Sequence, residues 1–334
     1  MVKNLIGKGN MKVIISDDYQ DCVKTLDCYP SLAQNFEVEI YQDTLTSLDA
    51  LAERFVSADA MLLVRERTPV SAELLARLPK LKFISQTGRA ANHVDLKACT
   101  ARGIAVSAEG SATVAAAELT WALVMASMRK VHLEAARLKA GLWQGHLGTG
   151  LRGRVLGIAG YGKIGSVVAG YGRAFGMRVV ALGDHATSIE AAASDGVETE
   201  SDRHVFFSQA DVVCCHLRLL PATRGSITQA DLAAMKPTAL FVNSSRSEVV
   251  QDGALESALA QGRPGFAAVD VYEREPIFGA DHPLLRFDNV LATPHIGYVE
   301  KDTYEHYFGI AIEQLLAWQA GQPINVLNPE ALKR

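Results

Sequence analysis

The chain has 334 residues, of which 49% are hydrophobic and 21% charged, so it is long enough for about two domains with substantial cores. Its formal net charge of −4 and the lack of any Lys/Arg-rich tract argue against nucleic acid or a membrane as a partner. The sequence shows no apolar stretch long enough to span a bilayer and no signal-peptide pattern, which favours a cytoplasmic protein. The five cysteines lack metal-ligand spacing, so we expect free thiols and no metal site.

The first strand pattern begins at Met11, and residues 1–10 are expected to form an irregular extension. From Met11 to about Val106, strand-like pieces alternate with helix-like pieces, and this alternation predicts a parallel sheet. The expected strands of this first series are 13–16, 36–41, 60–64, 83–86 and 105–106.

An Ala-rich segment over 112–142 follows, with few helix breakers and enough length to bridge two domains. A second alternating series then predicts another parallel sheet. Its expected strands are 155–159, 179–182, 212–217, 239–243, 267–269 and 290–292, and a last helix-like stretch covers 303–320.

A glycine fingerprint stands at the start of the second series and reads Gly160-Tyr161-Gly162-Lys163-Ile164-Gly165. Alone, such a fingerprint is as often a plain loop, but here a strand-like run precedes it and a helix-like stretch over 163–175 follows. The first Gly permits a tight turn, the second lets the backbone approach a pyrophosphate, and the third lets the helix pack on the strand. The next apolar run ends at Asp184, about 20 residues on, where ribose recognition is expected. This pattern predicts a dinucleotide-binding domain.

Further downstream, motifs occur at 211–217, 235–246, 269–276 and 293–297. In order and spacing they resemble the signatures of the D-isomer-specific 2-hydroxyacid dehydrogenases, the family of the D-3-phosphoglycerate dehydrogenases. The resemblance implies an α/β fold of two Rossmann-like or flavodoxin-like parallel-sheet domains. It implies that an NAD-binding domain over 109–301 is inserted into a split substrate domain over 1–108 and 302–334, with a cleft between the two.

The resemblance implies Arg246, Glu275 and His295 as the catalytic set. Reduction of a 2-keto acid needs an acid that titrates near neutral pH, which His supplies, and a carboxylate partner favours the charged imidazole and orients it. A planar guanidinium can hold the substrate carboxylate or polarise the C2 carbonyl. Each residue could instead be an ordinary surface group. We favour the site because Arg246 and Glu275 each follow a predicted strand; Glu273 is a competing carboxylate.

The resemblance also suggests further positions. Asp270 resembles a residue that contacts the nicotinamide amide, and His216 and Thr223 resemble residues lining the cofactor, although all three could be plain strand-end residues. The family's remaining cofactor positions correspond to Thr113, Ser244 and Gly297. Gly88, Arg89 and Ala90 align with a loop whose N–H groups hold the substrate carboxylate.

Arg89 stands where the family usually has a small residue, and it could add a positive charge for an acidic substrate or simply face solvent. The family's usual acidic residue at the end of the second strand is replaced by Gly183, and Asp184 comes one position later. A carboxylate at 184 would accept from the ribose hydroxyls and repel a 2′-phosphate, which favours NAD. If Asp184 points away, His185, Thr187 and Ser188 could receive a phosphate, so NADP stays possible.

The sequence therefore predicts an NAD-dependent oxidoreductase that interconverts a small 2-keto acid and a D-2-hydroxy acid, such as 3-phosphoglycerate, glyoxylate or hydroxypyruvate. The family implies a homodimer through the NAD-binding domain, including the segment over 112–142. Formate dehydrogenase shares the fold but pairs its His with Gln. A second alternative is an NAD(H)-sensing scaffold like the corepressors of this fold. The motifs do not distinguish among the 2-hydroxy acids.

Overall fold

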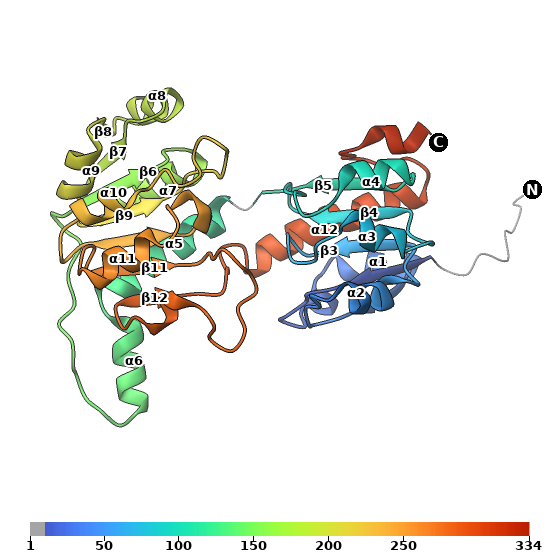
Figure 1. Cartoon of the computed structure of the whole chain (residues 1–334), viewed down its shortest axis with the longest axis horizontal. Helices are drawn as coiled ribbons and strands as arrows, with labels where there is room; N and C mark the ends of the chain where they lie inside the picture. The colour runs from blue at the N-terminus through green and yellow to red at the C-terminus, as the bar shows by residue number, and fades with distance from the viewer. Residues whose placement is uncertain (1–10, 112, 334) are drawn as a thin grey trace, which may run out of the picture. The chain divides into compact units, whose positions relative to one another are not determined.

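The protein, seen here as a computed structural model that describes residues 11–111 and 113–333, contains two compact α/β units (Figure 1). The first unit comprises the residues up to Ser111 together with those from Glu300 onward, and the second comprises Ala112–Val299. The second unit is thus inserted into the first, as the predicted fold class requires. The extension expected at 1–10 and the start of the Ala-rich segment at Ala112 lie outside the described residues.

The first unit is built on a five-stranded parallel sheet with the order β2-β1-β3-β4-β5, the flavodoxin-like arrangement. Its strands are β1 (Lys12–Ile15), β2 (Glu37–Ile40), β3 (Ala60–Leu63), β4 (Phe83–Thr87) and β5 (Ala105–Glu109). Its helices are α1 (Tyr29–Asn35), α2 (Leu48–Phe55), α3 (Ala72–Ala76), α4 (Leu96–Ala101) and α12 (Lys301–Gln319), with short 3-10 turns η1 (Val23–Thr25) and η4 (Pro329–Lys333). The central strands are buried throughout because helices cover both faces of the sheet.

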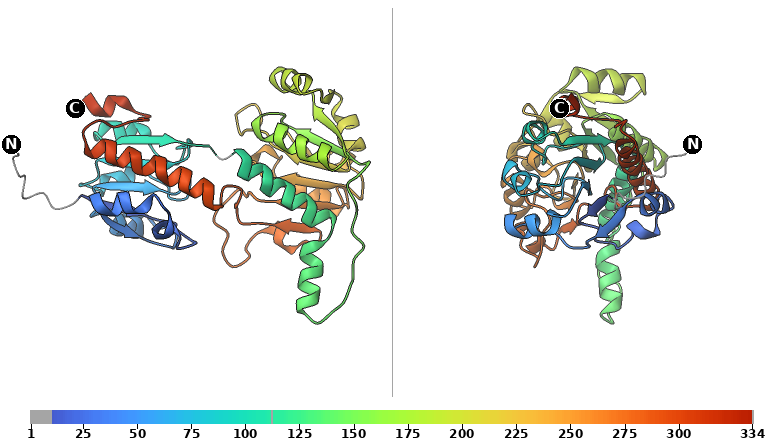
Figure 2. Two further views of the ribbon diagram at one scale, coloured as in Figure 1. Left: turned by 180° about the vertical axis from the view of Figure 1, so that it is seen from behind. Right: turned by 90° about the vertical axis from the view of Figure 1, so that its right-hand side faces the viewer.

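The helix α12 returns the end of the chain to the first unit, where it packs on β4 (Figure 2). The ring of Trp318 stacks on Phe83 with centroids 5.0 Å apart. Next to this stack, the hydroxyl of Ser85 donates to Oε1 of Gln314 at 2.8 Å inside the core. These buried contacts explain why residues so distant in sequence form one unit.

The second unit has a seven-stranded parallel sheet with the order β12-β11-β10-β9-β6-β7-β8. Its strands are β6 (Val155–Ala159), β7 (Arg178–Leu182), β8 (Glu198–Glu200), β9 (Val212–Cys215), β10 (Leu240–Asn243), β11 (Phe266–Val269) and β12 (Val290–Ala292). Its helices are α5 (Thr113–Met128), α6 (Val131–Lys139), α7 (Lys163–Ala174), α8 (Ala186–Ser194), α9 (Arg203–Gln209), α10 (Gln229–Ala234) and α11 (Ala254–Ala260), with 3-10 turns η2 (Ser247–Val249) and η3 (Pro283–Arg286).

The order of this sheet reverses between β6 and β9, which makes that point the topological switch of a Rossmann fold. Because every strand pair is parallel, the loops that follow the strands meet at one edge of the sheet. Ligands of open α/β sheets bind at this carboxyl edge. The glycine fingerprint and the motifs after β9, β10, β11 and β12 therefore share one edge.

The structure corrects three details of the sequence prediction. The segment expected over 112–142 is divided into α5 and α6 at Lys130, which has a left-handed φ of 57° and places its ammonium 3.0 Å from the centroid of the Phe266 ring. The strand β8 was missed because its residues, Glu-Thr-Glu, carry no apolar pattern. The strand expected over 212–217 ends at Cys215.

All five cysteines are free, as expected. In the part of the chain that the structure describes, no helix combines the length and the apolar character needed to cross a membrane.

Candidate active site

The glycine fingerprint forms the turn between β6 and α7. Gly160 has a φ of 95°, and a Cβ there would lie 2.8 Å from the backbone carbon of His216. A Cβ at Gly165 would lie 2.5 Å from the carbonyl oxygen of Gly160, so the third glycine permits the close packing of helix on strand. A Cβ at Gly162 would meet nothing within 4 Å. The second glycine thus leaves open space before the first turn of α7, which fits a pyrophosphate held by helix N–H groups.

Lys163 and Ile164 are the first residues of α7, directly after this open space. Their backbone N–H groups belong to the first turn, where N–H groups have no partner inside the helix. The described residues therefore fit a dinucleotide phosphate, as the sequence predicts.

Asp184 follows β7, and its Oδ2 lies 3.2 Å from Nη1 of Arg203. Its neighbour Gly183 donates its N–H to the carbonyl of Glu200 on β8, and a Cβ there would lie 2.8 Å from Oγ of Ser201. This close approach favours glycine at 183, so the first acidic side chain after β7 is that of Asp184.

The three alternative phosphate ligands lie beside Asp184, at the start of α8. His185 precedes the helix, and Thr187 and Ser188 belong to its first turn. Ser188 is buried, which disfavours it as a phosphate ligand, whereas His185 and Thr187 are exposed. The carboxylate at 184 stays our prediction for the ribose, and His185 and Thr187 stay the alternative ligands for a phosphate.

His295 and Glu275 form a close pair at the carboxyl edge. Nδ1 of His295 lies 2.6 Å from Oε2 of Glu275, and the two side chains are only 17% and 19% exposed. The other oxygen, Oε1, accepts the backbone N–H of Tyr272 at 3.0 Å. Because Nδ1 faces the carboxylate, Nε2 is the nitrogen that can exchange a proton with a substrate.

The competing carboxylate, Glu273, has a different partner. Its Oε2 lies 3.0 Å from Nε2 of His282, a buried residue whose Nδ1 accepts the N–H of Leu284. The structure therefore pairs His295 with Glu275 and leaves Glu273 with another imidazole.

Asp270 is almost fully buried and binds the loop that carries His295. Its Oδ1 accepts the Thr293 hydroxyl at 2.6 Å and the Ile296 N–H at 2.8 Å, and its Oδ2 accepts the Gly297 N–H at 2.9 Å. Burial raises the pKa of the Asp270 carboxyl, against the lowering effect of these hydrogen bonds. These contacts make Asp270 a positioning residue for His295, and its contact with the nicotinamide stays a prediction.

Arg246 follows β10, the strand next to β11. Its Nη1 donates to the carbonyl of Ser245 at 2.8 Å, and its own carbonyl accepts from Nδ2 of Asn243 at 3.0 Å. Because Asn243 is buried and its Oδ1 also accepts the Ser245 N–H, the turn that presents Arg246 has a defined geometry. Arg246 as a whole residue is partly exposed.

His216 follows β9 beside the glycine turn. Its Nε2 is buried and has no hydrogen-bond partner among the described residues. Burial lowers the pKa of this imidazole to about 4, so it is neutral at physiological pH. A buried ring nitrogen without a partner, next to Gly160, is consistent with a group that meets the cofactor.

Of three other predicted cofactor positions, Ser244 and Thr223 have hydrogen bonds within the chain. The Ser244 hydroxyl lies 2.7 Å from Oγ1 of Thr120 on α5, and Thr113 is the first residue of α5. The Thr223 hydroxyl accepts the N–H of Leu220 at 2.9 Å, which supports a role in holding its own loop.

The first unit has a separate candidate group at the ends of β3 and β4. Gly88 has a φ of 79°, and a Cβ there would overlap Nη1 of Arg65. Arg65 also has a left-handed φ of 55°, and its N–H donates to Oγ1 of Thr87 at 2.9 Å. Sequence reasoning missed Arg65, although a charged run directly after the buried strand β3 was a signal that could have found it.

Arg89 is 75% exposed, and its Nη2 lies 2.7 Å from Oε1 of Glu109. This pairing offsets its charge, so the solvent-facing alternative is favoured. Ala90 follows it and is partly buried.

Residues 121–297 match the family model described as the NAD binding domain of D-isomer specific 2-hydroxyacid dehydrogenase. The match covers the fingerprint, all the motifs after β9 to β12, and the pair formed by His295 and Glu275.

Curated proteins and solved structures agree with this match. The chain is 34% identical to the D-3-phosphoglycerate dehydrogenase of Methanocaldococcus jannaschii over 95% of its own length, and it spans 59% of that protein. It is 35% identical to the glyoxylate reductase of Aeropyrum pernix, over 90% of this chain and 92% of that protein. A crystal structure of an oxidoreductase from Ralstonia solanacearum superimposes with a TM-score of 0.93 at 48% identity, covering 96% of this chain and 98% of that one.

Proposed function

The chain belongs to the D-isomer-specific 2-hydroxyacid dehydrogenases, which are NAD-dependent enzymes, and we propose that Arg246, Glu275 and His295 are its catalytic residues. The reaction is the interconversion of a small 2-keto acid and its D-2-hydroxy acid. The contact of 2.6 Å between His295 and Glu275 carries this proposal, because it provides a proton donor whose charged form is stabilised by a carboxylate.

In the direction of reduction, bound NADH supplies the hydride that adds to C2 of the keto acid. Nε2 of His295 gives its proton to the C2 oxygen, so that hydride and proton together complete the alcohol. Glu275 keeps the imidazole oriented through Nδ1 and stabilises its positive charge until the proton has left. In the direction of oxidation, neutral His295 accepts the hydroxyl proton.

Arg246 polarises the C2 carbonyl and holds the substrate carboxylate. A guanidinium suits this role because it is always charged and can form two parallel hydrogen bonds with fixed geometry. The side chain of Asn243 fixes the turn that presents it.

The anion-binding groups and the names of the relatives support our expectation for the substrate class. Gly88 offers a backbone N–H in a conformation that suits a carboxylate, and the Arg65 guanidinium lies directly beside it. We therefore expect a small acid such as hydroxypyruvate, glyoxylate or the keto acid of 3-phosphoglycerate.

A panel of keto acids tests the proposal. The intact chain is mixed with NADH and with glyoxylate, hydroxypyruvate, 3-phosphohydroxypyruvate, or branched and aromatic 2-keto acids, and NADH oxidation is followed. We expect at least one acid to support a turnover of roughly 1 per second or faster. Tight NADH binding without turnover of any acid would favour the NAD(H)-sensing scaffold instead.

The oligomeric state is part of the proposal. The helix α6 contains no buried residue, and several large apolar side chains on α6 and the segment after it are more than half exposed. These are Val131, Leu138, Trp143 and Leu147. A run of this kind on one segment is typical of a protein interface, and we assign it to a homodimer.

A further inference from the structure

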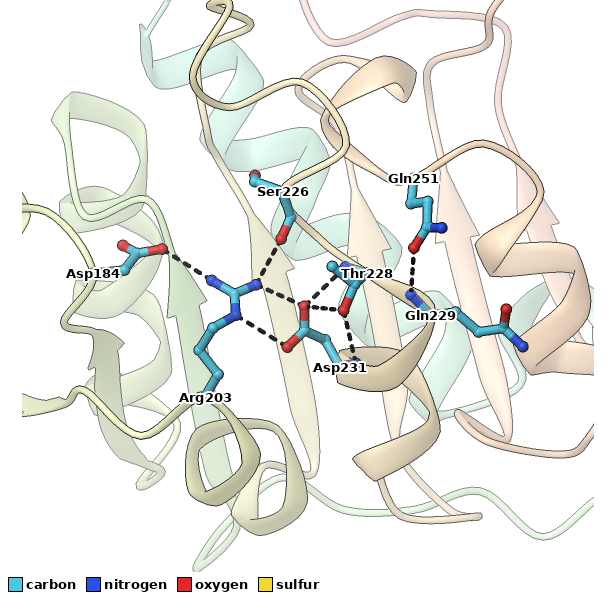
Figure 3. Close-up of polar contacts among 7 residues, drawn as sticks. All are labelled: Asp184, Arg203, Ser226, Thr228, Gln229, Asp231 and Gln251. Atoms are coloured by element: carbon cyan, nitrogen blue, oxygen red, sulfur yellow. Dashed lines mark hydrogen bonds and ion pairs between the residues drawn. The ribbon is translucent and has the colours of Figure 1, made fainter.

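Arg203, the first residue of α9, lies between two carboxylates near the end of β7 (Figure 3). Its Nε and Nη2 donate to the two oxygens of Asp231 at 3.1 and 2.7 Å. Nη2 also donates to the carbonyl of Ser226 at 2.7 Å, whereas Nη1 points to Oδ2 of Asp184 at 3.2 Å. One edge of the guanidinium is thus bound to Asp231 and the other is directed at the predicted ribose carboxylate.

The Asp231 side of this arrangement is rigid. Asp231 is buried, and its Oδ2 also accepts the N–H and the hydroxyl of Thr228 in the capping box that begins α10. Burial alone would raise the pKa of Asp231, but the hydrogen bonds from Arg203 and Thr228 outweigh it and lower the pKa. A two-bond fork of this kind fixes both the position and the plane of the guanidinium.

The Asp184 side is a single, longer contact. Only Oδ2 meets Arg203, and Oδ1 has no hydrogen bond with any residue that the structure describes. Asp184 could therefore accept a ribose hydroxyl while it stays beside Arg203. Because Asp231 holds the guanidinium through two hydrogen bonds, Arg203 should keep its position when Asp184 is replaced.

These observations bear on how the site treats a 2′-phosphate. A phosphate at the ribose 2′ position would be repelled by Asp184 and attracted by Arg203 beside it. We propose that Arg203 is a second determinant of cofactor choice. With Asp184 present, the positive charge of Arg203 weakens the repulsion between Asp184 and the 2′-phosphate of NADP. In a variant without Asp184, Arg203 binds the 2′-phosphate directly. The inference rests on the proposed cofactor site and deepens it.

The test is equilibrium binding of NADH and NADPH without substrate, followed by dinucleotide fluorescence. The quantity of interest is the ratio of the NADPH dissociation constant to the NADH dissociation constant. Asp184→Ser should lower this ratio about tenfold or more, and Arg203→Gln should raise it. In the double variant, the ratio of the NADPH to the NADH dissociation constant should be at least fivefold higher than in Asp184→Ser alone.

Arg178 provides the matched control. It begins β7, at the opposite end of the strand that leads to Asp184, and its Nη1 pairs with Glu198 at 2.8 Å. Arg178→Gln removes the same charge as Arg203→Gln but at the far end of β7 from Asp184, so the gain from Asp184→Ser should persist in this background. If Arg203→Gln fails to fold because Asp231 is left buried and unpaired, Arg203→Gln with Asp231→Asn replaces it.

The outcomes separate the two proposals. An NADPH gain of equal size with and without Arg203 would overturn the role of Arg203 and leave the enzyme function intact. If Arg203→Gln and Arg178→Gln both abolish the improvement in NADPH binding caused by Asp184→Ser, the role of Arg203 is also overturned. The effect would then come from any positive charge nearby and not from Arg203 in particular. If the wild-type chain binds neither dinucleotide, the proposed function fails together with this inference.

Discussion

At the scale of single residues, Glu273 and Glu275 show how two carboxylates of one short loop take different roles. Glu275 is fixed by the Tyr272 N–H and is mostly buried, so its second oxygen is available in one orientation for His295. Glu273 is 54% exposed and pairs with His282. A buried, oriented carboxylate stabilises an imidazolium more than an exposed one because water screens it less.

This difference gives a prediction for the proton transfer. Glu275→Gln should lower kcat/KM for reduction by about tenfold or more and should affect oxidation less, because reduction needs the charged imidazole and oxidation the neutral one. His295→Gln should lose roughly 10²–10⁴-fold in both directions. Steady-state rates in both directions measure these effects.

Glu273→Gln is the matched control for this experiment, since it removes the same charge two residues away. Its kinetic constants should stay close to those of the wild type. A larger loss in Glu273→Gln than in Glu275→Gln would contradict the pairing of Glu275 with His295.

The second prediction concerns Arg246. Arg246→Lys keeps the positive charge but loses the planar fork, so kcat/KM should fall by an amount equivalent to about 2–5 kcal/mol while NADH binding changes little. Stopped-flow reduction and NADH titration of the same preparation measure the two quantities. Normal turnover of the best keto acid by this variant would remove Arg246 from the site.

A third prediction concerns His93 in the loop after Gly88. Both of its ring nitrogens are buried without a hydrogen-bond partner in the described residues. Burial, with a smaller contribution from Arg65 and against the effect of Glu66, lowers the pKa of His93 from 6.5 to about 4. Between these two values the unfolded chain binds a proton at His93 and the folded chain does not, so the free energy of unfolding falls as the pH is lowered from about 6.5 to about 4.

His93→Gln should therefore flatten the loss of stability across this pH window. Urea unfolding of both proteins at several pH values measures the effect, and His204→Gln, at an exposed histidine, is the control. Parallel stability curves for wild type and His93→Gln would show that His93 does not contribute.

At the scale of elements, the turn from β6 to α7 is defined by glycines with different surroundings. Gly165 has no room for a Cβ because the carbonyl of Gly160 would lie 2.5 Å away, whereas a Cβ at Gly170, on the same helix, would meet nothing within 4 Å. The close approach at Gly165 brings the first turn of α7 to the end of β6, where the dinucleotide phosphates are expected.

The fourth prediction compares these two glycines. Gly165→Ala should destabilise the protein by about 1–3 kcal/mol through overpacking and weaken NADH binding. Gly170→Ala should stabilise it by up to about 1 kcal/mol because alanine favours helix. Thermal unfolding with and without NADH measures both effects, and equal melting temperatures for the two variants would contradict the argument.

At the scale of the whole molecule, the exposed apolar segment of α6 and the residues after it is the feature that a single chain does not explain. Trp143 is 74% exposed and Leu147 is 96% exposed. Covering such apolar side chains with a second copy of the chain is favourable, because it removes apolar surface from water. The predicted interface is therefore expected to involve α6 and to continue past residue 142 into the segment that follows it.

The fifth prediction tests that interface. Trp143→Ser combined with Leu147→Ser should shift the protein from dimer to monomer in sedimentation velocity, with little change in the unfolding of each unit. Val56→Ser, at an exposed apolar residue of the first unit, is the control and should stay dimeric. A wild-type chain that sediments as a monomer at all concentrations would exclude the homodimer.

Much of the fold follows from the sequence by itself. The alternation of apolar strands and helices, and the fingerprint after β6, define two parallel sheets with their loops at one edge, because connections in parallel sheets return every strand to the same direction. Arg246, Glu275 and His295 were predicted from the resemblance to the family, and the positions of Arg246 and Glu275 directly after predicted strands supported that prediction. The sequence did not predict the edge strand β8, because a solvent-facing edge strand needs no apolar pattern.

The tertiary structure decided which side chains meet. Glu275 rather than Glu273 reaches His295, Arg203 joins Asp184 to Asp231, and Arg65 lies over Gly88. These contacts join residues about 20 or more positions apart, so they depend on how the loops of different strands are placed and not on local periodicity. Sequence alone specifies the edge at which a site forms, whereas the packing of the loops selects the pairs within it, because short-range charge pairing requires placement to within a few tenths of an ångström.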